Sequence, residues 1–421
     1  MEADLKKLIF QIGNDAKSVV QKLARIDSAT KKRAIKAAAM TIKAATSEII
    51  SANLLDLENA KQKGLSESNI DRLMLNKERI NSIISSLETI ADMDDPVGKT
   101  LDAWDRPNGM KISKVTVPLG VIGIIYESRP NVTADAGILC LKSGNAVILR
   151  GGSEAVHSNQ AIHIAMMKGL VENGIPEKSI QLIPTQDRSA VDMMLKEMVS
   201  FIDVIIPRGG KSLIASVQEN ARVPVMGHLE GICHTYVHSD AELEMSISII
   251  LNAKMRRTGI CGATETVLIH QDVIASHVPA ITQALMEAGC EVRADEKIAP
   301  FATGCQIASE SDWGKEFLSP IIAIKSVDSI EEAIDHICQF GSGHTECIIS
   351  SSIECAELFF NNIDSAILMH NVSTQFADGG EFGLGAEIGI ATGKIHARGP
   401  VGAAQLVSYK YQISGSGQIR P

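Results

Sequence analysis

The sequence predicts an α/β protein with two doubly wound α/β domains and a small β-strand extension. Three observations support this fold class. The 421 residues exceed one ordinary hydrophobic core, so more than one domain is expected. Between residues 119 and 220, short apolar runs alternate with helical patterns, which is typical of an open parallel sheet. A second half with strand and helix patterns begins near residue 228.

The elements follow in order. Apolar side chains recur at helical spacing from residue 1 to about 92, and a turn at 94–98 ends the pattern. Residues 110–118 alternate polar and apolar side chains like an exposed strand, and residues 405–413 repeat this alternation and could pair with them. A strand of this kind usually finds a partner, often in another subunit. The expected parallel strands are 120–126, 146–150, 179–184 and 201–206 in the first half, and 267–269, 320–324 and 347–351 in the second.

Composition excludes several classes of function. The net charge is −10 without a block of like charges, which argues against a nucleic acid partner and gives no sign of a membrane surface. No apolar run is long enough to span a bilayer, and the N-terminus lacks a signal-peptide pattern. The eight cysteines form no CxxC pair and no Cys/His cluster with zinc spacing. We therefore expect free thiols, a cytoplasmic location and no metal site.

Glycine pairs mark a candidate phosphate-binding edge. Ligands of open parallel sheets bind at the carboxyl ends of the strands. Arg150 ends the second expected strand before a Gly-Gly pair, and Arg208 precedes another pair after the fourth. The N–H groups of such turns can bind phosphate, although each pair can also be a plain turn. GxGxxG is absent, which argues against an ordinary Rossmann dehydrogenase but leaves nucleotide binding open.

Cys261 is the candidate nucleophile. Arg256 and Arg257 precede it, and Gly259 and Gly262 lie around it. A thiolate at neutral pH needs nearby positive charge, and glycine lets a substrate carbonyl approach backbone N–H groups. A lone cysteine is more often a core residue, so other parts of the chain must support a catalytic role.

Several longer segments resemble the aldehyde dehydrogenase superfamily and, within it, the gamma-glutamyl phosphate reductase family. The resemblance covers nearly the whole chain. Besides the segment around Cys261, it rests on VPLGVIG (117–123), YESRPNVT (126–133), GNAVILRGG (144–152), DVIIPRGG (203–210), GICH (231–234), FGLGAEIG (382–389) and HARGP (396–400).

The resemblance implies roles for single residues. It makes Cys261 the nucleophile, and it makes Asn131 and the Cys261 N–H the oxyanion donors. Arg150 falls where the superfamily keeps a lysine at the adenosine ribose, and Ser153 falls where NAD-preferring members often have an acidic residue. An arginine without a nearby carboxylate would bind a 2′-phosphate, which favours NADPH. Glu316 matches the glutamate that holds the nicotinamide ribose. The expected cofactor site also includes Gly151, Gly152, Gly209 and Gly210.

Two departures from the superfamily pattern stand out. Aldehyde-oxidising members carry a water-activating glutamate whose counterpart lies within 227–231, where His228 takes that position and Glu230 is close enough to compete for it. Loss of this base fits an enzyme that reduces a thioester, because activated water would only hydrolyse it. Gly262 stands where the family is expected to have asparagine. No role is assigned to His234, Glu387 or Arg398.

The implied reaction is the NADPH-dependent reduction of L-glutamyl 5-phosphate to L-glutamate 5-semialdehyde, with release of phosphate, in proline biosynthesis. Arg256 and Arg257 are candidates to bind the substrate's phosphate or carboxylate, or are a surface pair that only raises the local potential. The alternatives are an aldehyde-oxidising dehydrogenase and a non-catalytic partner of glutamate kinase.

The implied domain organisation has three parts. An NADP(H)-binding domain comprises 1–109 and 119–227, and a catalytic domain comprises 228–397. Residues 110–118 and 398–421 form an oligomerisation flap, so we expect a homo-oligomer, either dimer or tetramer. Glutamate kinase is the suggested protein partner.

Overall fold

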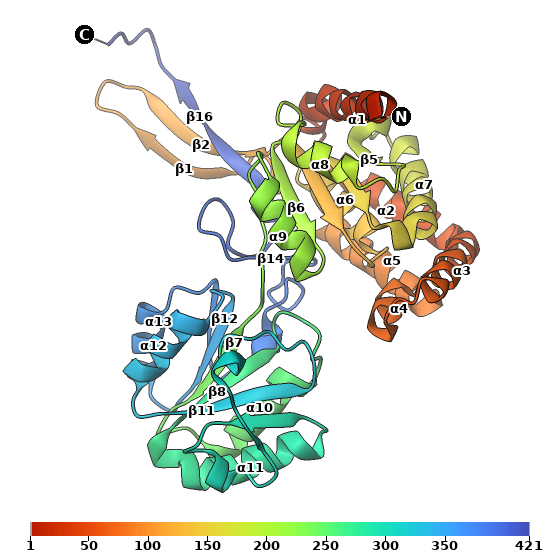
Figure 1. Ribbon diagram of the computed structural model, residues 1–421. Helices are drawn as coiled ribbons and strands as arrows, with labels where there is room; N and C mark the ends of the chain where they lie inside the picture. The colour runs from red at the N-terminus through yellow and green to blue at the C-terminus, as the bar shows by residue number, and fades with distance from the viewer. Residues whose placement is uncertain (1, 421) are drawn as a thin grey trace.

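The computed structural model describes residues 2–420, which form two α/β bodies and a projecting three-stranded sheet (Figure 1). The first body contains a four-stranded parallel sheet in the order β5-β4-β3-β6. All residues of β3 are buried, as expected for a strand covered on both faces. The strands are β3 (Val121–Tyr126), β4 (Ala146–Gly151), β5 (Ile180–Leu182) and β6 (Val204–Arg208).

The four strands predicted for this half are confirmed, but β5 is shorter than its predicted span of 179–184 and β6 is displaced toward the C-terminus. Strand β6 begins at Val204 rather than at residue 201. The ring of Phe201 packs edge-on against Phe10, with centroids 5.5 Å apart, and Ile202 is buried. These two residues are therefore apolar because of packing, not because of strand pairing.

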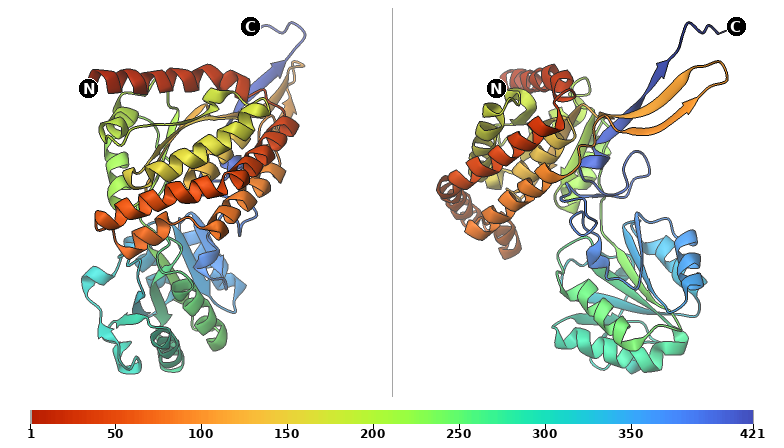
Figure 2. Two further views of the ribbon diagram at one scale, coloured as in Figure 1. Left: turned by 90° about the vertical axis from the view of Figure 1, so that its right-hand side faces the viewer. Right: turned by 180° about the vertical axis from the view of Figure 1, so that it is seen from behind.

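Helices surround this sheet, and α2 packs against α5 and α7 (Figure 2). The helices are α1 (Glu2–Leu23), α2 (Ser28–Ala44), α3 (Thr46–Gln62), α4 (Glu67–Leu73), α5 (Lys77–Asp92), α6 (Val132–Lys142), α7 (Val156–Glu172), α8 (Ser189–Lys196) and α9 (Lys211–Asn220). No helix within residues 2–420 combines the length and the hydropathy needed to cross a membrane.

The second body contains a seven-stranded parallel sheet in the order β10-β9-β11-β8-β7-β12-β13. Its strands are β7 (Cys233–Val237), β8 (Thr264–His270), β9 (Glu291–Ala294), β10 (Gln306–Ile307), β11 (Ile321–Val327), β12 (Thr345–Ile349) and β13 (Ile367–His370). The helices are α10 (Leu243–Met255), α11 (Ile274–Glu287), α12 (Ile330–Phe340) and α13 (Ile353–Asn362). The three strands predicted here correspond to β8, β11 and β12, whereas β7, β9, β10 and β13 were not predicted.

The projecting sheet is antiparallel, in the order β1-β2-β16, and reaches away from both bodies in Figures 1 and 2. Its strands are β1 (Thr100–Asp105), β2 (Lys111–Pro118) and β16 (Val407–Ser414). The predicted pairing of the two alternating segments is confirmed, since Val407 pairs with Pro118 and Ser414 with Lys111. The sequence did not predict β1, whose six residues are all exposed. A short antiparallel pair, β14 (Ile390–Ala391) and β15 (Gly399–Pro400), completes the strands.

Candidate active site

Cys261 lies at the amino-terminal edge of the second sheet. Strands β8, β7 and β12 are neighbours in this parallel sheet, so their amino ends lie at one edge. Cys261 lies three residues before β8, and His344 lies directly before β12. His228 lies on the segment that leads into β7. The Cys261 sulfur and one ring nitrogen of each histidine lie within 4.8 Å of one another.

The two histidines control the charge of the thiol. Burial would raise the pKa of Cys261, but the positive charge of His344 and a hydrogen bond to His228 outweigh it and hold the pKa well below its ordinary value. Burial alone would lower the pKa of His228, yet interaction with Cys261 raises it. The pair therefore favours thiolate and imidazolium. The sequence offered the two preceding arginines as nearby positive charge or as ligands of the substrate's anionic groups, and it did not identify these histidines as neighbours of the thiol.

A second thiol beside the site shows the opposite behaviour. The Cys233 S–H donates to the backbone oxygen of Cys261 at 3.0 Å. Burial raises the pKa of Cys233 well above its ordinary value, so this thiol stays protonated. All eight cysteines are unpaired, as the sequence predicts.

The orientation of His228 distinguishes it from Glu230. Its Nδ1 lies 2.6 Å from the Ile390 carbonyl oxygen, and because a carbonyl only accepts, Nδ1 is the donor. The Nε2 atom is thus left for the thiol. Glu230 instead forms an ion pair with Lys211 at 2.6 Å. His228, rather than Glu230, is the neighbour of the nucleophile.

Gly231 and Glu316 lie against the nucleophile loop. A Cβ atom on Gly231 would stand 2.2 Å from the Cys261 oxygen and 2.5 Å from its Cα, so no side chain fits there. The Gly231 N–H donates to Glu316 Oε1 at 2.8 Å. Burial raises the pKa of Glu316, and the nearby Cys261 charge raises it further. Glu316 therefore lies in the same site as the nucleophile.

The two predicted oxyanion donors occupy different surroundings. Within residues 2–420, the Cys261 N–H donates to no other group. The Asn131 amide donates to the Asp135 carboxylate at 2.9 Å and lines a cavity of about 330 Å³. At Gly262, where the family pattern suggested asparagine, an added Cβ would lie 3.1 Å from the Thr374 oxygen, a tight contact that a shift of a few tenths of an ångström would relieve.

An arginine cluster faces this site, and the sequence reasoning assigned a role only to one member of it. Arg72, Arg129 and Arg257 line the cavity that contains Asn131. Burial and the positive charges of Arg208, Arg72 and Arg257 lower the pKa of Arg129 to about 10, while Cys261 opposes this change. Among residues 2–420, none of these four arginines forms an ion pair. A cluster of unneutralised guanidinium groups is suited to an anion.

Arg256 does not join this cluster. Its Nη1 lies 3.3 Å from the Gln375 oxygen, and it lines a separate cavity with Phe376 and Glu381. The structure thus divides the two arginines that the sequence treated as a pair. Arg129 and Arg208 lie inside segments that carried the family resemblance, and their position at the carboxyl ends of β3 and β6 was the signal that could have identified them.

The predicted cofactor residues lie at the carboxyl ends of β4 and β6. Arg150 and Ser153 line a cavity of about 350 Å³ together with Arg188 and Leu213. The expectation that Arg150 has no nearby carboxylate is wrong, because Glu154 lies close enough to raise its pKa against the lowering effect of burial. The Arg150 Nη atoms donate to backbone oxygens, including Gln186 O at 3.1 Å, while the buried Nε has no partner.

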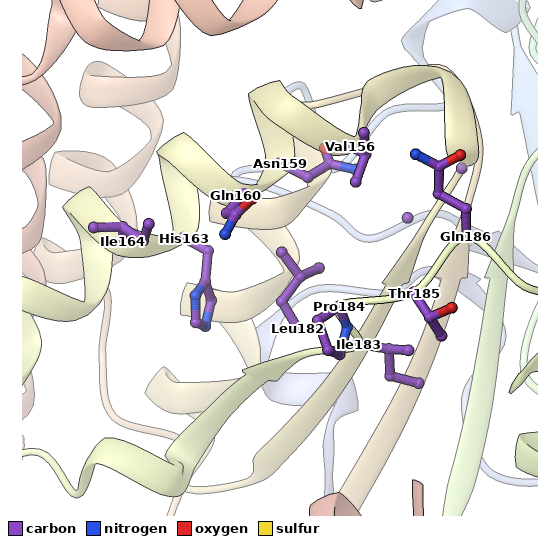
Figure 3. A pocket seen from close by; sticks show the side chains of 12 residues that line it. Val156, Asn159, Gln160, His163, Ile164, Leu182, Ile183, Pro184, Thr185 and Gln186 are labelled. Carbon is purple, nitrogen blue, oxygen red and sulfur yellow. The ribbon is translucent and has the colours of Figure 1, made fainter. Parts of the chain in front are cut away.

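The glycine turns adjoin this cavity. Gly209 and Gly210 line a second cavity with Ser153 and Glu127, and the Gly210 N–H at the start of α9 donates to Glu127 at 3.1 Å. Gly151 and Gly152 border a third, smaller cavity between α7 and the segment after β5. Figure 3 shows the side chains of α7, from Val156 to Ile164, facing those of residues 182–186.

His234, Arg398 and Glu387, to which the sequence assigned no role, lie in different surroundings. His234 is fully buried and bonded to Glu346 at 3.0 Å, so it is a core histidine. Arg398 forms an ion pair with Asp364. Glu387 is closer to the chemistry: burial raises its pKa to about 7, against the opposing charge of Arg208, and Cys261 contributes to the rise.

Comparisons with known proteins agree with these observations. A family model described as "Aldehyde dehydrogenase family" matches residues 4–313. Gamma-glutamyl phosphate reductase of Allorhizobium ampelinum is 55% identical over 414 residues, covering 98% of this chain and 97% of its own. Gamma-glutamyl phosphate reductase of Brucella suis is 53% identical over 420 residues, covering 100% of this chain and 100% of its own. The crystal structure of gamma-glutamyl phosphate reductase from Thermotoga maritima matches with a TM-score of 0.95 and 42% identity, covering 98% of this chain and 100% of that one.

Proposed function

The chain belongs to the aldehyde dehydrogenase family and, within it, to the gamma-glutamyl phosphate reductases, and from this we propose that it reduces L-glutamyl 5-phosphate to L-glutamate 5-semialdehyde and releases phosphate. The single observation that best supports this chemistry is the thiol of Cys261 held between His228 and His344. A thiolate is the nucleophile that an acyl phosphate requires, and the lowered pKa of Cys261 favours that form.

Cys261, Asn131 and His228 have separate roles in the proposed reaction. The Cys261 sulfur attacks the γ-carbonyl carbon, and the oxyanion that forms accepts hydrogen bonds from the Cys261 N–H and the Asn131 amide. The C–O bond to phosphate breaks, and the His228 imidazolium supplies the proton that the leaving phosphate takes. The product is a thioester on Cys261. A bound NADPH supplies the hydride that reduces this thioester. Cys261 then leaves as a thiolate and His228 regains its proton from water.

The surroundings of His228 and Glu230 support reduction of the thioester over oxidation of an aldehyde. An aldehyde-oxidising enzyme needs a base that activates water against the thioester. Although burial opposes it, the hydrogen bond to Cys261 raises the pKa of His228, and Lys211 holds the Glu230 carboxylate. The Glu230 carboxylate is therefore not free to activate water against the thioester, which supports its reduction by hydride.

The arginine cluster is the proposed substrate anion site. Acyl phosphate carries most of its negative charge on the phosphoryl group, and a guanidinium forms paired hydrogen bonds to such oxygens. Arg129 is the central candidate, because Arg72, Arg208 and Arg257 surround it and it interacts with Cys261. Arg256 stays a weaker candidate, since its guanidinium lies against Gln375.

Membership of this family implies a nicotinamide cofactor, and we propose that it is NADPH. The cavity at the carboxyl ends of β4 and β6 fits such a molecule, because the buried Arg150 Nε lacks a partner and open space lies in front of Gly210. Arg150 is held by backbone oxygens, so the exposed Arg188 in the same cavity is the better candidate for the 2′-phosphate. Glu316 is the proposed ligand of the nicotinamide ribose.

The projecting sheet is the proposed oligomerisation surface. Trp104, Tyr411 and Ile413 are exposed on it, and an open sheet edge with apolar side chains usually pairs with another chain. The partner is a second copy of this chain. Glutamate kinase, which supplies the unstable acyl phosphate, is a further proposed partner, and free thiols fit a cytoplasmic location.

The proposal is tested in the reverse direction. Purified protein is mixed with the semialdehyde, phosphate and NADP⁺, and the rise of NADPH absorbance is followed, then repeated with NAD⁺ and without phosphate. We expect phosphate-dependent turnover with a preference for NADP⁺, abolished in Cys261→Ser. Turnover that does not depend on phosphate would instead indicate an aldehyde-oxidising dehydrogenase.

A further inference from the structure

The sequence offered no metal site by spacing, but the fold brings one Cys and two His side chains together. Cys261, His228 and His344 are separated by up to 116 positions in the sequence, yet their ligand atoms all lie within 4.8 Å of one another. We propose that these three side chains bind one Zn²⁺ ion reversibly and that this ion inhibits the enzyme by occupying the nucleophile. This inference goes beyond the reductase activity, and only its inhibitory effect depends on Cys261 being the nucleophile.

The donor set fits zinc. A thiolate and two imidazole nitrogens are ligands that Zn²⁺ prefers, and sites with three protein ligands keep a fourth position for water. Tetrahedral geometry with Zn–N and Zn–S bonds of about 2.1 and 2.3 Å places ligand atoms roughly 3.5 Å apart. Ligand atoms that lie within 4.8 Å of one another reach that spacing when side-chain rotation moves them by about 1 Å.

The histidines are already oriented for coordination. The His228 Nδ1–H is used by the Ile390 oxygen at 2.6 Å, which leaves the Nε2 lone pair available once its proton is lost. His344 is fully buried, and its Nδ1 lies 2.9 Å from the Thr345 hydroxyl. The His344 Nε2 atom is buried and has no hydrogen-bond partner, so it is available as a ligand. Hydrogen bonds from the outer ring nitrogen are what fix the ring orientation in zinc sites.

The thiolate is the remaining requirement. Zn²⁺ coordinates the thiolate form of cysteine, and its binding releases the thiol proton. An ion bound at Cys261 uses the sulfur lone pair that would attack the acyl phosphate. Zn²⁺ should therefore compete with both the substrate and alkylating reagents.

A second Cys/His contact provides a matched control. The Cys355 sulfur lies 3.7 Å from His238 Nε2, so it offers one thiol and one imidazole away from the nucleophile. Two ligands hold zinc much more weakly than three. The Cys355→Ser variant should consequently behave like the parent protein in every zinc measurement.

The experiment measures binding and inhibition separately. Metal-free protein is titrated with Zn²⁺ against a chromophoric chelator, and with Co²⁺ while thiolate-to-metal charge-transfer absorption is recorded. We expect one tight ion per chain, loss of the charge-transfer band in Cys261→Ser, and at least 10- to 100-fold weaker binding in His344→Asn. His228→Asn serves the same purpose if His344→Asn does not fold.

Inhibition is then followed by alkylation. Zn²⁺ should slow the reaction of iodoacetamide with Cys261 in parallel with the loss of turnover, and a chelator should restore both. Equal zinc affinity in Cys261→Ser and the parent overturns the proposal, as does inhibition that leaves Cys261 alkylation unchanged. Because binding is read by absorption, a protein without reductase activity can still support or overturn it.

Discussion

Replacing Gly231 with alanine should damage catalysis far more than folding. The added Cβ would lie 2.2 Å from the Cys261 oxygen, 2.5 Å from its Cα and 2.5 Å from its Cβ. Two of these three atoms belong to the backbone, so rotation of a side chain cannot relieve the contact. An ordinary carbon contact needs about 3.5 Å or more, and the two segments must therefore separate by roughly 1 Å.

The expected cost follows from that displacement. Overpacking of this kind typically destabilises a protein by ~1–3 kcal/mol, which most folded chains survive. A nucleophile displaced by about 1 Å loses on the order of 100-fold in rate. The same displacement would lengthen the bond from the Gly231 N–H to Glu316, now 2.8 Å, which is the proposed ribose ligand.

The assay compares Gly231→Ala with Gly393→Ala. A Cβ added to Gly393 would meet no atom within 4 Å, so alanine is accommodated there. Turnover in the reverse direction is measured beside urea unfolding for both variants. We expect the control to match the parent and Gly231→Ala to lose about 100-fold in turnover while still unfolding cooperatively. A Gly231→Ala protein with turnover within twofold of the parent would refute the close packing of Gly231 on Cys261.

Three further predictions follow from the site. His228→Asn and His344→Asn should each raise the pKa of the nucleophilic thiol, which the structure places well below its ordinary value. The thiolate exists above that pKa, so the midpoint of iodoacetamide alkylation should move to higher pH. Once the midpoint lies above neutral pH, alkylation at neutral pH should slow roughly tenfold for every further pH unit of the midpoint. An unchanged alkylation profile would show that the histidines do not stabilise the thiolate. Arg129→Ala should raise the KM for phosphate in the reverse assay by roughly 10- to 100-fold with little change for NADP⁺, whereas Arg79→Ala, whose side chain is paired with Asp71, should not. Arg188→Ala should lower the NADPH-to-NADH preference about tenfold, and equal preference in the variant and the parent would exclude Arg188 as the 2′-phosphate ligand.

The sequence predicted local elements well because their signals are local. The apolar runs behind β3 and β4 and the alternation behind β2 and β16 identify strands directly. Strand β1 escaped detection because all six of its residues are exposed, and no buried face imposes an apolar period. The start of β6 was misplaced because Phe201 and Ile202 are apolar for packing reasons.

The environment of the nucleophile was harder to predict from the sequence. Its charge partner His344 becomes a neighbour only because β12 lies next to β7 in the sheet, and strand order is not encoded by hydrophobic period. The role of Arg150 depended on whether a carboxylate lies nearby in space, and Glu154 does. Both errors concern distances between elements, which only the packed structure defines.

Cys261 is proposed to carry the substrate as a thioester, and one pre-steady-state measurement tests this directly. Protein at known active-site concentration is mixed with the semialdehyde and NADP⁺ in the absence of phosphate, and NADPH is followed on the millisecond scale. Cys261 should take one substrate per site, so we predict a burst of about one NADPH per chain, then a near-halt, then resumed turnover when phosphate is added. The absence of a burst in the parent protein, or an equal burst in Cys261→Ser, would contradict the account.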